Sequence, residues 1–182
     1  MEEYAYILDY LAQGLPGSHG RRGPTCFALG ESKFKLFELE PLPGAIVNIG
    51  EKVYIGEDKE KREVISRVQR RIGFGELTNA AQLELEFVIL EIVQSDPARF
   101  IRIYNEAQPI SRKRHLLEEI PGLGNKSAVA IYQEVQRNGP FKDFEDLSAR
   151  IPSVRTPDKF LARRIMDELA DDDIKYRMLV AR

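Results

Sequence analysis

The stretch that decides the fold of the C-terminal half is a glycine-containing turn between two expected helices, Ile120-Pro121-Gly122-Leu123-Gly124-Asn125-Lys126-Ser127-Ala128. Glycine allows a positive φ and a close approach of two backbones, which helices joined by so few residues require. The following helix begins with backbone N–H groups that lack partners and lie at the positive end of its dipole. Such a helix start attracts anions such as phosphate, and Lys126 adds a positive charge there. The turn therefore predicts an anion site, whose residues are Gly122, Leu123, Gly124, Asn125, Lys126 and Ser127.

Apolar residues at helical spacing predict helices on both sides of this turn. We expect one helix over residues 112–119 and the next over residues 126–137, which Gly139-Pro140 ends. Asp143 should cap a short helix up to residue 150, and Thr156-Pro157 should begin a long last helix. Thr78 or Asn79 should cap an earlier helix that runs to about residue 94 and carries Leu83, Phe87 and Leu90 on one apolar stripe facing the core. Asp96-Pro97 should begin the helix that follows it. The alternative is a helix pair whose turn binds nothing, because a sharp turn needs glycine in either case.

The first 75 residues show the short apolar segments of β-structure instead. Strands are expected over residues 4–11, 25–29, 33–39 and 52–55. Residues 63–74 fit either a strand or a helix, because Val64, Val68 and Ile72 satisfy both periods, and we favour a fifth strand. Five short strands separated by long loops predict a small barrel similar to an OB-fold.

The composition excludes several kinds of site. Cys26 is the only cysteine, and His19 and His115 are the only histidines, so we expect neither an intramolecular disulfide nor a zinc site. No glycine-rich nucleotide loop and no catalytic Ser/His/Asp set occurs, so no cofactor and no catalytic residue are expected. The acidic start lacks the basic region of a signal peptide, and no apolar run reaches the roughly 20 residues of a membrane helix. We therefore expect a cytoplasmic protein that does not contact membranes.

The net charge of −2 argues against a uniformly basic surface but not against local basic patches. Further candidate contacts with an anionic partner form three groups: Arg21 and Arg22 in a glycine-rich loop, Arg67, Arg70 and Arg71 in the fifth strand, and Arg112, Lys113 and Arg114 before the turn. The alternative for each group is a solvated face. Aromatic residues of the barrel either stack on a ligand or fill the core, and the candidates are Tyr6, Tyr10, Phe34, Phe37 and Tyr54.

Residues 116–128 resemble the helix-hairpin-helix motif of DNA- and RNA-binding repair, replication and ribosomal proteins. The resemblance rests on the apolar residues before the turn, the Pro-Gly-apolar-Gly pattern, and Lys126 and Ala128 at set offsets. Residues 139–147 resemble the helix that connects paired hairpins. Residues 150–154 then fall where a second hairpin is expected, but they lack both glycines, so this second copy is degenerate.

Nearly the whole chain of 182 residues resembles an archaeal domain-of-unknown-function family, family 655. The resemblance is carried by residues 4–11, 49–56, 70–72 and 76–78 and by the turn itself. It implies an OB-like barrel followed by helix-hairpin-helix elements, in proteins usually described as predicted RNA-binding proteins, and it implies no known reaction. The expected fold is α+β, with a five-stranded OB-like β-barrel over residues 1–75, a helical bridge over residues 76–108 and an all-α helix-hairpin-helix domain over residues 109–182.

These observations favour a non-enzymatic nucleic-acid-binding protein, with RNA preferred to DNA as the partner. The turn would hold the phosphate backbone, and the barrel would supply a second contact surface. A protein-interaction scaffold in a ribosome- or repair-associated complex, with a protein partner, is the first alternative. The second is a DNA-repair enzyme, because glycosylases place a catalytic aspartate after such a hairpin. Asp143 lies at a suitable distance, but its surroundings predict a helix cap.

Overall fold

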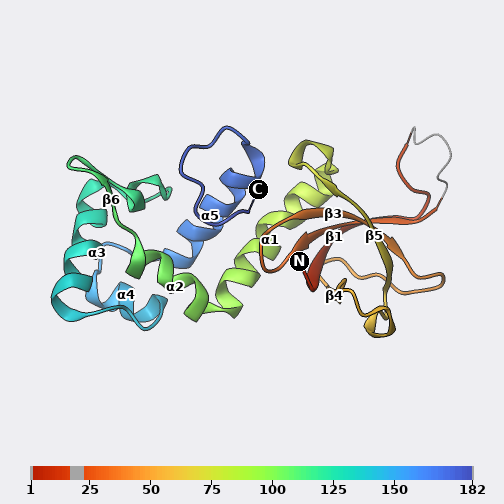
Figure 1. Ribbon diagram of the computed structural model, residues 1–182, viewed down its shortest axis with the longest axis horizontal. Helices are drawn as coiled ribbons and strands as arrows, with labels where there is room; N and C mark the ends of the chain where they lie inside the picture. Colours follow the sequence, from red (N-terminus) through yellow and green to blue (C-terminus); the bar gives the residue numbers. More distant parts are fainter. Residues whose placement is uncertain (1, 17–22, 182) are drawn as a thin grey trace. The chain divides into compact units, whose positions relative to one another are not determined.

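The chain forms two compact units, and the computed structural model describes residues 2–16 and 23–181 (Figure 1). The first unit comprises the chain up to Val88 together with the residues from Leu179 onward, and the second comprises Ile89–Met178. Helix α1 (Asn79–Ser95) begins in the first unit and ends in the second. The units therefore divide the chain at different places from the boundaries at 75/76 and 108/109 that the sequence suggests.

The first unit is built on a five-stranded antiparallel sheet that curls into a half-barrel (Figure 1). Its strands lie in the order β4-β1-β2-β3-β5. Their bounds are β1 (Tyr4–Leu11), β2 (Thr25–Gly30), β3 (Leu36–Pro41), β4 (Lys52–Tyr54) and β5 (Ile65–Ile72). The expected α+β class is confirmed, and the ambiguous segment 63–74 contains a strand.

The core of the sheet is built mainly from small and β-branched side chains, with Leu39 as the exception. The pairing of β1 with β2 shifts register between Ile7 and Asp9, and such a bulge increases the local twist. Beyond this bulge β1 pairs with β2 alone, whereas Tyr4–Tyr6 also pairs with β4. The buried core residues are Ala5, Ile7, Cys26, Ala28, Leu39, Val53, Ile55 and Ile65.

The turn between β2 and β3 explains why β3 begins at Leu36 rather than at the predicted residue 33. Phe34 has a φ of +54° and is completely buried, so tertiary packing holds it in a conformation that alternation alone does not predict. The buried carboxylate of Glu2 accepts hydrogen bonds from the backbone N–H groups of Ser32 and Lys33, at 2.8 and 2.7 Å. The backbone N–H of Lys33 is therefore bonded to Glu2 and does not pair with a neighbouring strand, so the strand starts later.

Helix α1 starts at the expected place but buries a different face from the predicted one. The Thr78 hydroxyl caps it by accepting from the N–H of Ala81 at 3.1 Å, and it donates to Asp9 at 2.5 Å. Leu83 and Phe87, expected to face the core, are 69% and 71% exposed. The buried positions of the helix are Ala81, Leu85, Val88, Ile89, Ile92 and Val93.

The second unit carries the remaining helices. Their bounds are α2 (Pro97–Glu106), α3 (Asn125–Asn138), α4 (Phe144–Arg150) and α5 (Pro157–Ala170). The expected helix over residues 112–119 is wrong, and so is an all-α C-terminal part. A two-stranded hairpin of β6 (Pro109–Ser111) and β7 (Arg114–His115) and a 3-10 turn, η3 (Leu116–Glu119), occupy this segment.

The residue His115 is the physical reason for this local structure. Its side-chain Nδ1 atom accepts from the N–H of Leu117 at 3.1 Å, and its backbone N–H donates to the Glu118 carboxylate at 2.7 Å. These reciprocal bonds form a capping box, which ends β7 and starts a helical turn only at Leu116. The predicted helix is thereby reduced to its last four residues.

Candidate nucleic-acid interface

The glycine turn before α3 places two glycines in different environments. Gly122 has a φ of +94°, and a Cβ atom there would lie 2.6 Å from the Phe160 ring of α5. Gly124 has an ordinary φ of −85°, and a Cβ atom there would meet nothing within 4 Å. The N–H of Leu123 donates to the Ile120 carbonyl at 3.1 Å, and both side chains are buried. Gly122 is therefore required by packing, whereas Gly124 leaves open space above the helix start.

Helix α3 begins with backbone N–H groups that point away from the helix body. Gly124 occupies the N-cap position and offers no side-chain acceptor, and the first turn holds no acidic residue. Within residues 2–16 and 23–181, no hydrogen-bond acceptor meets the backbone N–H groups of Asn125, Lys126 and Ser127. Asn125 and Lys126 are exposed. This arrangement can hold an anion at the positive end of the helix dipole.

One carboxylate lies beside this helix start. Glu118 accepts from the side-chain amide of Asn125 at 3.2 Å as well as from the N–H of His115. The hydrogen bond from the His115 backbone, with that from Asn125, lowers the pKa of Glu118 below its ordinary value of 4.5. Glu118 is therefore ionised at neutral pH and makes the local potential less positive than the amides and Lys126 alone would.

A second turn repeats part of this geometry between α4 and α5. The N–H of Val154 donates to the Ile151 carbonyl at 3.0 Å, as Leu123 does to Ile120 in the first turn. Thr156 takes the N-cap position of α5 without a side-chain cap, but Pro157 follows as the first helical residue. Because proline has no N–H group, the start of α5 offers fewer donors than the start of α3.

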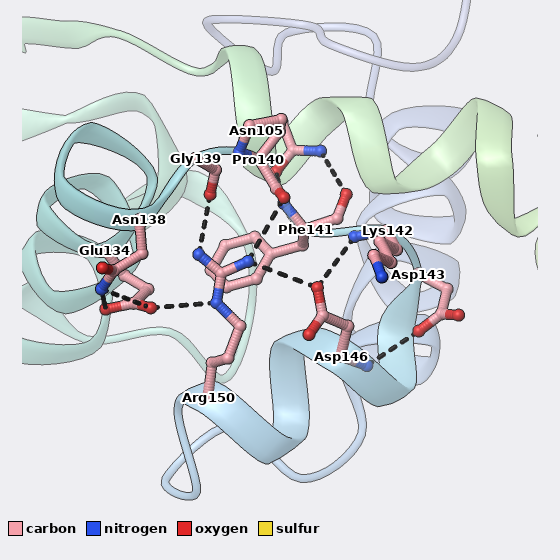
Figure 2. A network of polar contacts seen from close by, with 10 residues as sticks. All are labelled: Asn105, Glu134, Asn138, Gly139, Pro140, Phe141, Lys142, Asp143, Asp146 and Arg150. Atoms are coloured by element: carbon pink, nitrogen blue, oxygen red, sulfur yellow. Dashed lines mark hydrogen bonds and ion pairs between the residues drawn. The ribbon is translucent and has the colours of Figure 1, made fainter.

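Arg150 fastens the connection between α3 and α4, as Figure 2 shows. Its guanidinium donates to the carbonyl groups of Gly139 at 2.7 Å and Pro140 at 3.2 Å, which follow α3. It also pairs with Glu134 at 2.9 Å and with Asp146 at 3.3 Å. The Arg150 side chain thus bonds the carbonyls that follow α3 and also bridges one carboxylate from α3 and one from α4.

Asp143, the residue weighed as a catalytic candidate, is the N-cap of α4 (Figure 2). Its carboxylate accepts from the N–H of Asp146 at 2.8 Å. Asp143 also lines an open hollow of about 520 Å³ in the second unit, where Asp158 accepts from Gln94 and Arg155 supplies a positive charge. The geometry gives Asp143 a structural task, as its sequence context predicts.

The arginines of β5 are engaged with the neighbouring strand. Arg67 pairs with Glu40 at 2.7 Å, and Arg70 pairs with Glu38 at 2.7 Å and with Glu76 at 2.6 Å. Arg71 donates to the carbonyl of Ala181 at 3.2 Å, which holds the C-terminal segment to the first unit. The charges of Arg67 and Arg70 are balanced by carboxylates, whereas Arg71 is exposed and bonds a neutral carbonyl. The group therefore contributes less to an anion surface than the sequence suggests.

The basic residues before the turn lie in the β6–β7 hairpin. Arg112 and Lys113 are exposed at its tip, and neither has an ion-pair partner in the described part of the chain. Arg114 forms an ion pair with Glu119. The His115 ring lies 5.2 Å from the Tyr132 ring of α3, which ties the hairpin to that helix. Arg21 and Arg22 lie outside the described residues.

Among the aromatic candidates, the structure separates core from surface. Tyr6 and Phe34 are buried, whereas Tyr10 is 38% exposed. Sequence patterns alone did not single out Tyr4, which is 39% exposed and meets the Tyr54 ring edge-on at 5.4 Å between centroids. The Lys52 ammonium lies 4.7 Å from the Tyr4 ring, and Lys52 also pairs with Glu31. Once β1 is paired with β4, the alternation of side chains along each strand places Tyr4, Lys52 and Tyr54 on the same face of the sheet.

Metal-binding and membrane-spanning features are absent from the described residues. No group of three or more histidine, cysteine, aspartate or glutamate side chains among them is arranged to hold a metal ion. None of the helices they form is long and apolar enough to cross a membrane. Cys26 is buried, and burial, with the charge of Asp9, raises the pKa of its thiol to about 12. The thiol is therefore protonated at neutral pH and unreactive.

The sheet, the helical unit and the two similar turns define an α+β protein with one open helix start. The chain belongs to the family described as "Protein of unknown function (DUF655)", which matches residues 1–181. It is 39% identical over 180 residues to the uncharacterized protein MJ0038 of Methanocaldococcus jannaschii, covering 98% of this chain and 80% of that one. It is also similar to the crystal structure of Af1531 from Archaeoglobus fulgidus, with a TM-score of 0.88 and 33% identity, covering 99% of this chain and 100% of that one.

Proposed function

We propose that this protein is a non-enzymatic nucleic-acid-binding protein that holds the phosphate backbone through the amides at the start of α3. The observation that carries the proposal is the uncapped helix start behind Gly124, where a Cβ atom would meet nothing within 4 Å. Backbone N–H groups at a helix start bind phosphate oxygens whatever the base sequence. Lys126, exposed at the same place, adds a charge that favours the same ligand.

The turn fits a helix-hairpin-helix assignment, with one departure. Two turns share the same N–H to C=O closure, from Leu123 to Ile120 and from Val154 to Ile151, and α4 connects them. The helix before the first turn is replaced by the 3-10 turn η3. Because phosphate contact depends on the helix after the turn, this departure leaves the proposed contact intact.

The curled sheet supplies the second contact surface. We assign it as an OB-like barrel on whose strands β1 and β4 an aromatic pair, the exposed Tyr4 and the half-buried Tyr54, lies beside Lys52. Aromatic rings next to cations bind single strands, because every base can stack on a ring while the cation meets the backbone. RNA is the favoured ligand because recognition of RNA mostly targets unpaired bases, although a DNA single strand can stack on the same rings.

The first test is the salt dependence of binding to a single-stranded RNA and a DNA of the same sequence. Removing one phosphate contact lowers the slope of log affinity against log salt by about 0.7 for single strands. Replacing Arg112 and Lys113 with alanine should therefore lower the slope by roughly 1.4. Arg67→Ala is the matched control, because Arg67 is already paired with Glu40, and its slope should change little. A slope near zero for the wild type would contradict the proposal.

The second test separates the helix start from the rest of the surface. Gly124→Val fills the open space where the phosphate would lie, and Lys126→Glu reverses the charge beside it. Both should weaken binding to RNA while circular dichroism and the unfolding midpoint stay close to those of the wild type. Unchanged affinity in both variants would show that the turn has only a structural task.

A protein-interaction scaffold is the second candidate, and the exposed apolar side chains of α1 favour it. Leu83 and Phe87 lie one turn apart and are 69% and 71% exposed, which is unusual for large apolar residues in a helix. If the folded protein binds neither RNA nor DNA at low salt, the nucleic-acid proposal fails and this candidate takes its place. A pull-down in which Leu83→Ser with Phe87→Ser abolishes the capture of one defined protein would then support it.

A further inference from the structure

Tyr176 is an exposed aromatic residue held in an unfavourable backbone conformation. Its φ is +60°, and 36% of its surface is exposed. A left-handed conformation is uncommon for a residue other than glycine, asparagine or aspartate, and it persists only where surrounding contacts enforce it. Packing of the ring into a core does not explain the conformation, because the ring lies at the surface.

A buried ion pair enforces this conformation. Arg164 and Glu168 of α5 pair at 2.9 Å, and their side chains are 6% and 0% exposed. The same guanidinium donates to the carbonyl of Tyr176 at 2.9 Å, and the Glu168 carboxylate accepts from the N–H of Met178 at 2.9 Å. Two buried charged side chains, Arg164 and Glu168, therefore hold the backbone at Tyr176 and at Met178 and form a clamp on the segment that carries the ring.

The clamp also fixes the ring to the glycine turn. Arg164 donates to the carbonyl of Glu119 at 2.7 Å, and Glu119 immediately precedes Ile120, where the turn begins. One guanidinium thus joins the backbone of Tyr176 to the backbone of the turn that leads into α3. The position of the ring relative to the proposed phosphate site is therefore set by the buried Arg164 guanidinium, which holds both backbone segments.

Two cations lie within range of the ring. The Arg114 guanidinium is 5.9 Å from its centroid, and the Lys175 ammonium is 5.5 Å from it. These distances are within the roughly 6 Å of a cation–π contact, so both cations lie over the ring. A base that stacks here replaces one of them or stacks on the Arg114 guanidinium. An exposed ring with basic neighbours has the composition of a base-stacking platform, and arginine can itself stack on a base.

The geometry points to a nucleobase-binding site at Tyr176, in which an unpaired base stacks on the ring while a phosphate of the same strand lies at the start of α3. This inference rests on the proposed function and adds a base contact to its backbone contact. The acidic run of Asp171, Asp172 and Asp173 precedes the platform, and Arg177 pairs with Asp172 at 3.3 Å. Because these carboxylates repel phosphate, stacking rather than charge contributes most of the binding at this position.

The test uses the full-length protein and two probes of about 12 nucleotides, a single-stranded RNA and a strand of the same length without bases. Tyr176→Gly removes the ring and its contacts but also relieves the positive φ, which offsets part of the loss in stability, and urea unfolding checks that the variant remains folded. It should lower affinity for the RNA by roughly 5- to 150-fold and leave affinity for the baseless strand unchanged. Tyr176→Phe keeps the ring and should bind as the wild type does.

A second readout reports on the site directly. The sequence contains no tryptophan, so Tyr176→Trp creates a single tryptophan that can be excited apart from the tyrosines, and RNA should quench its emission whereas the baseless strand should not. Phe87→Trp, on the exposed face of α1, is the control and should not respond. If RNA binds tightly but Tyr176→Gly has no effect and the emission of Tyr176→Trp is not quenched, this inference is overturned and the proposed function stands. If the wild type binds neither probe, both are overturned.

Discussion

The position that a Cβ atom would take on Gly122 lies 2.6 Å from Cε1 of Phe160, so the first turn and helix α5 leave no room for a side chain there. Gly124, two residues later, faces open space with an ordinary φ. The two glycines of one motif thus meet different demands. The first is needed for the packing of the second unit, and the second is available for a ligand.

This difference predicts that alanine at Gly122 mainly lowers stability, whereas alanine at Gly124 mainly weakens RNA binding. Gly122→Ala adds a clash that costs about 1–3 kcal/mol and a left-handed residue that costs roughly another 1–2 kcal/mol. Gly124→Ala should cost less than about 1 kcal/mol, because only a modest N-cap preference is removed. Urea unfolding measures the stabilities, and binding to single-stranded RNA measures the function. We expect Gly124→Ala to bind RNA more weakly while it remains folded, and equal stability losses in the two variants would contradict the assignment.

The bidentate contacts of Arg150 predict that lysine cannot replace it. Arg150→Lys keeps one charge but removes the fork that reaches Gly139, Pro140, Glu134 and Asp146 together. We expect a loss of about 1–3 kcal/mol in the free energy of unfolding, since hydrogen bonds that involve a charged group contribute that much. Arg102→Lys is the control, because Arg102 makes only an exposed pair with Glu106. If Arg150→Lys unfolds at the same urea concentration as this control, the network does not stabilise the α3–α4 connection.

Much of the fold follows from the sequence, because local signals and tertiary packing agree there. The strands β1, β2 and β4, the caps at Thr78, Asp96 and Asp143, and the helix starts at Pro97 and Pro157 lie where turn residues and apolar spacing predict. The hairpin β6–β7 could not be predicted in this way. Residues 112–119 consist mainly of residue types that favour helices, but the imidazole of His115 accepts a backbone hydrogen bond that a helix would not allow.

The candidate site is predictable only in part. The glycine turn and its helix are visible in the sequence, because their chemistry is local. The pairing of Arg67 with Glu40 and of Arg70 with Glu38 depends on strand register, which a basic cluster in sequence does not reveal. The face shared by Tyr4 and Lys52 depends on the pairing of β1 with β4. Tyr176 is placed by Arg164, twelve residues away, through a backbone contact that no spacing rule describes.

The buried pair of Arg164 and Glu168 predicts a large effect from a single substitution. Glu168→Gln leaves the guanidinium enclosed without its counter-charge, which costs about 3–5 kcal/mol for a buried pair. Arg163→Met is the matched control on the same helix, because Arg163 pairs with Asp167 at the surface and should change stability by less than about 0.5 kcal/mol. Limited proteolysis should also cut residues 171–178 faster in Glu168→Gln. Equal cleavage rates in the two variants would show that the pair does not hold this segment.

His115 predicts a dependence of stability on pH above the range in which carboxylates titrate. Burial lowers the pKa of His115 below its ordinary value of 6.5, and the opposing charge of Glu118 only partly restores it. As the pH falls through 6.5, the unfolded chain takes up a proton at His115 while the native imidazole stays neutral and keeps its hydrogen bond from Leu117. The free energy of unfolding should therefore decrease as the pH falls from about 7 towards the native pKa of His115.

His115→Asn isolates this contribution, because its Oδ1 atom can accept from Leu117 as Nδ1 does but does not titrate. The variant should be somewhat less stable at every pH, since the ring contact with Tyr132 at 5.2 Å is removed. Its free energy of unfolding should nevertheless fall less steeply than that of the wild type between about pH 7 and the lower pKa, as measured by urea titrations at a series of pH values. His19 is present in both proteins and contributes equally. Parallel pH profiles for the two would mean that His115 is protonated as readily in the native turn as in the unfolded chain.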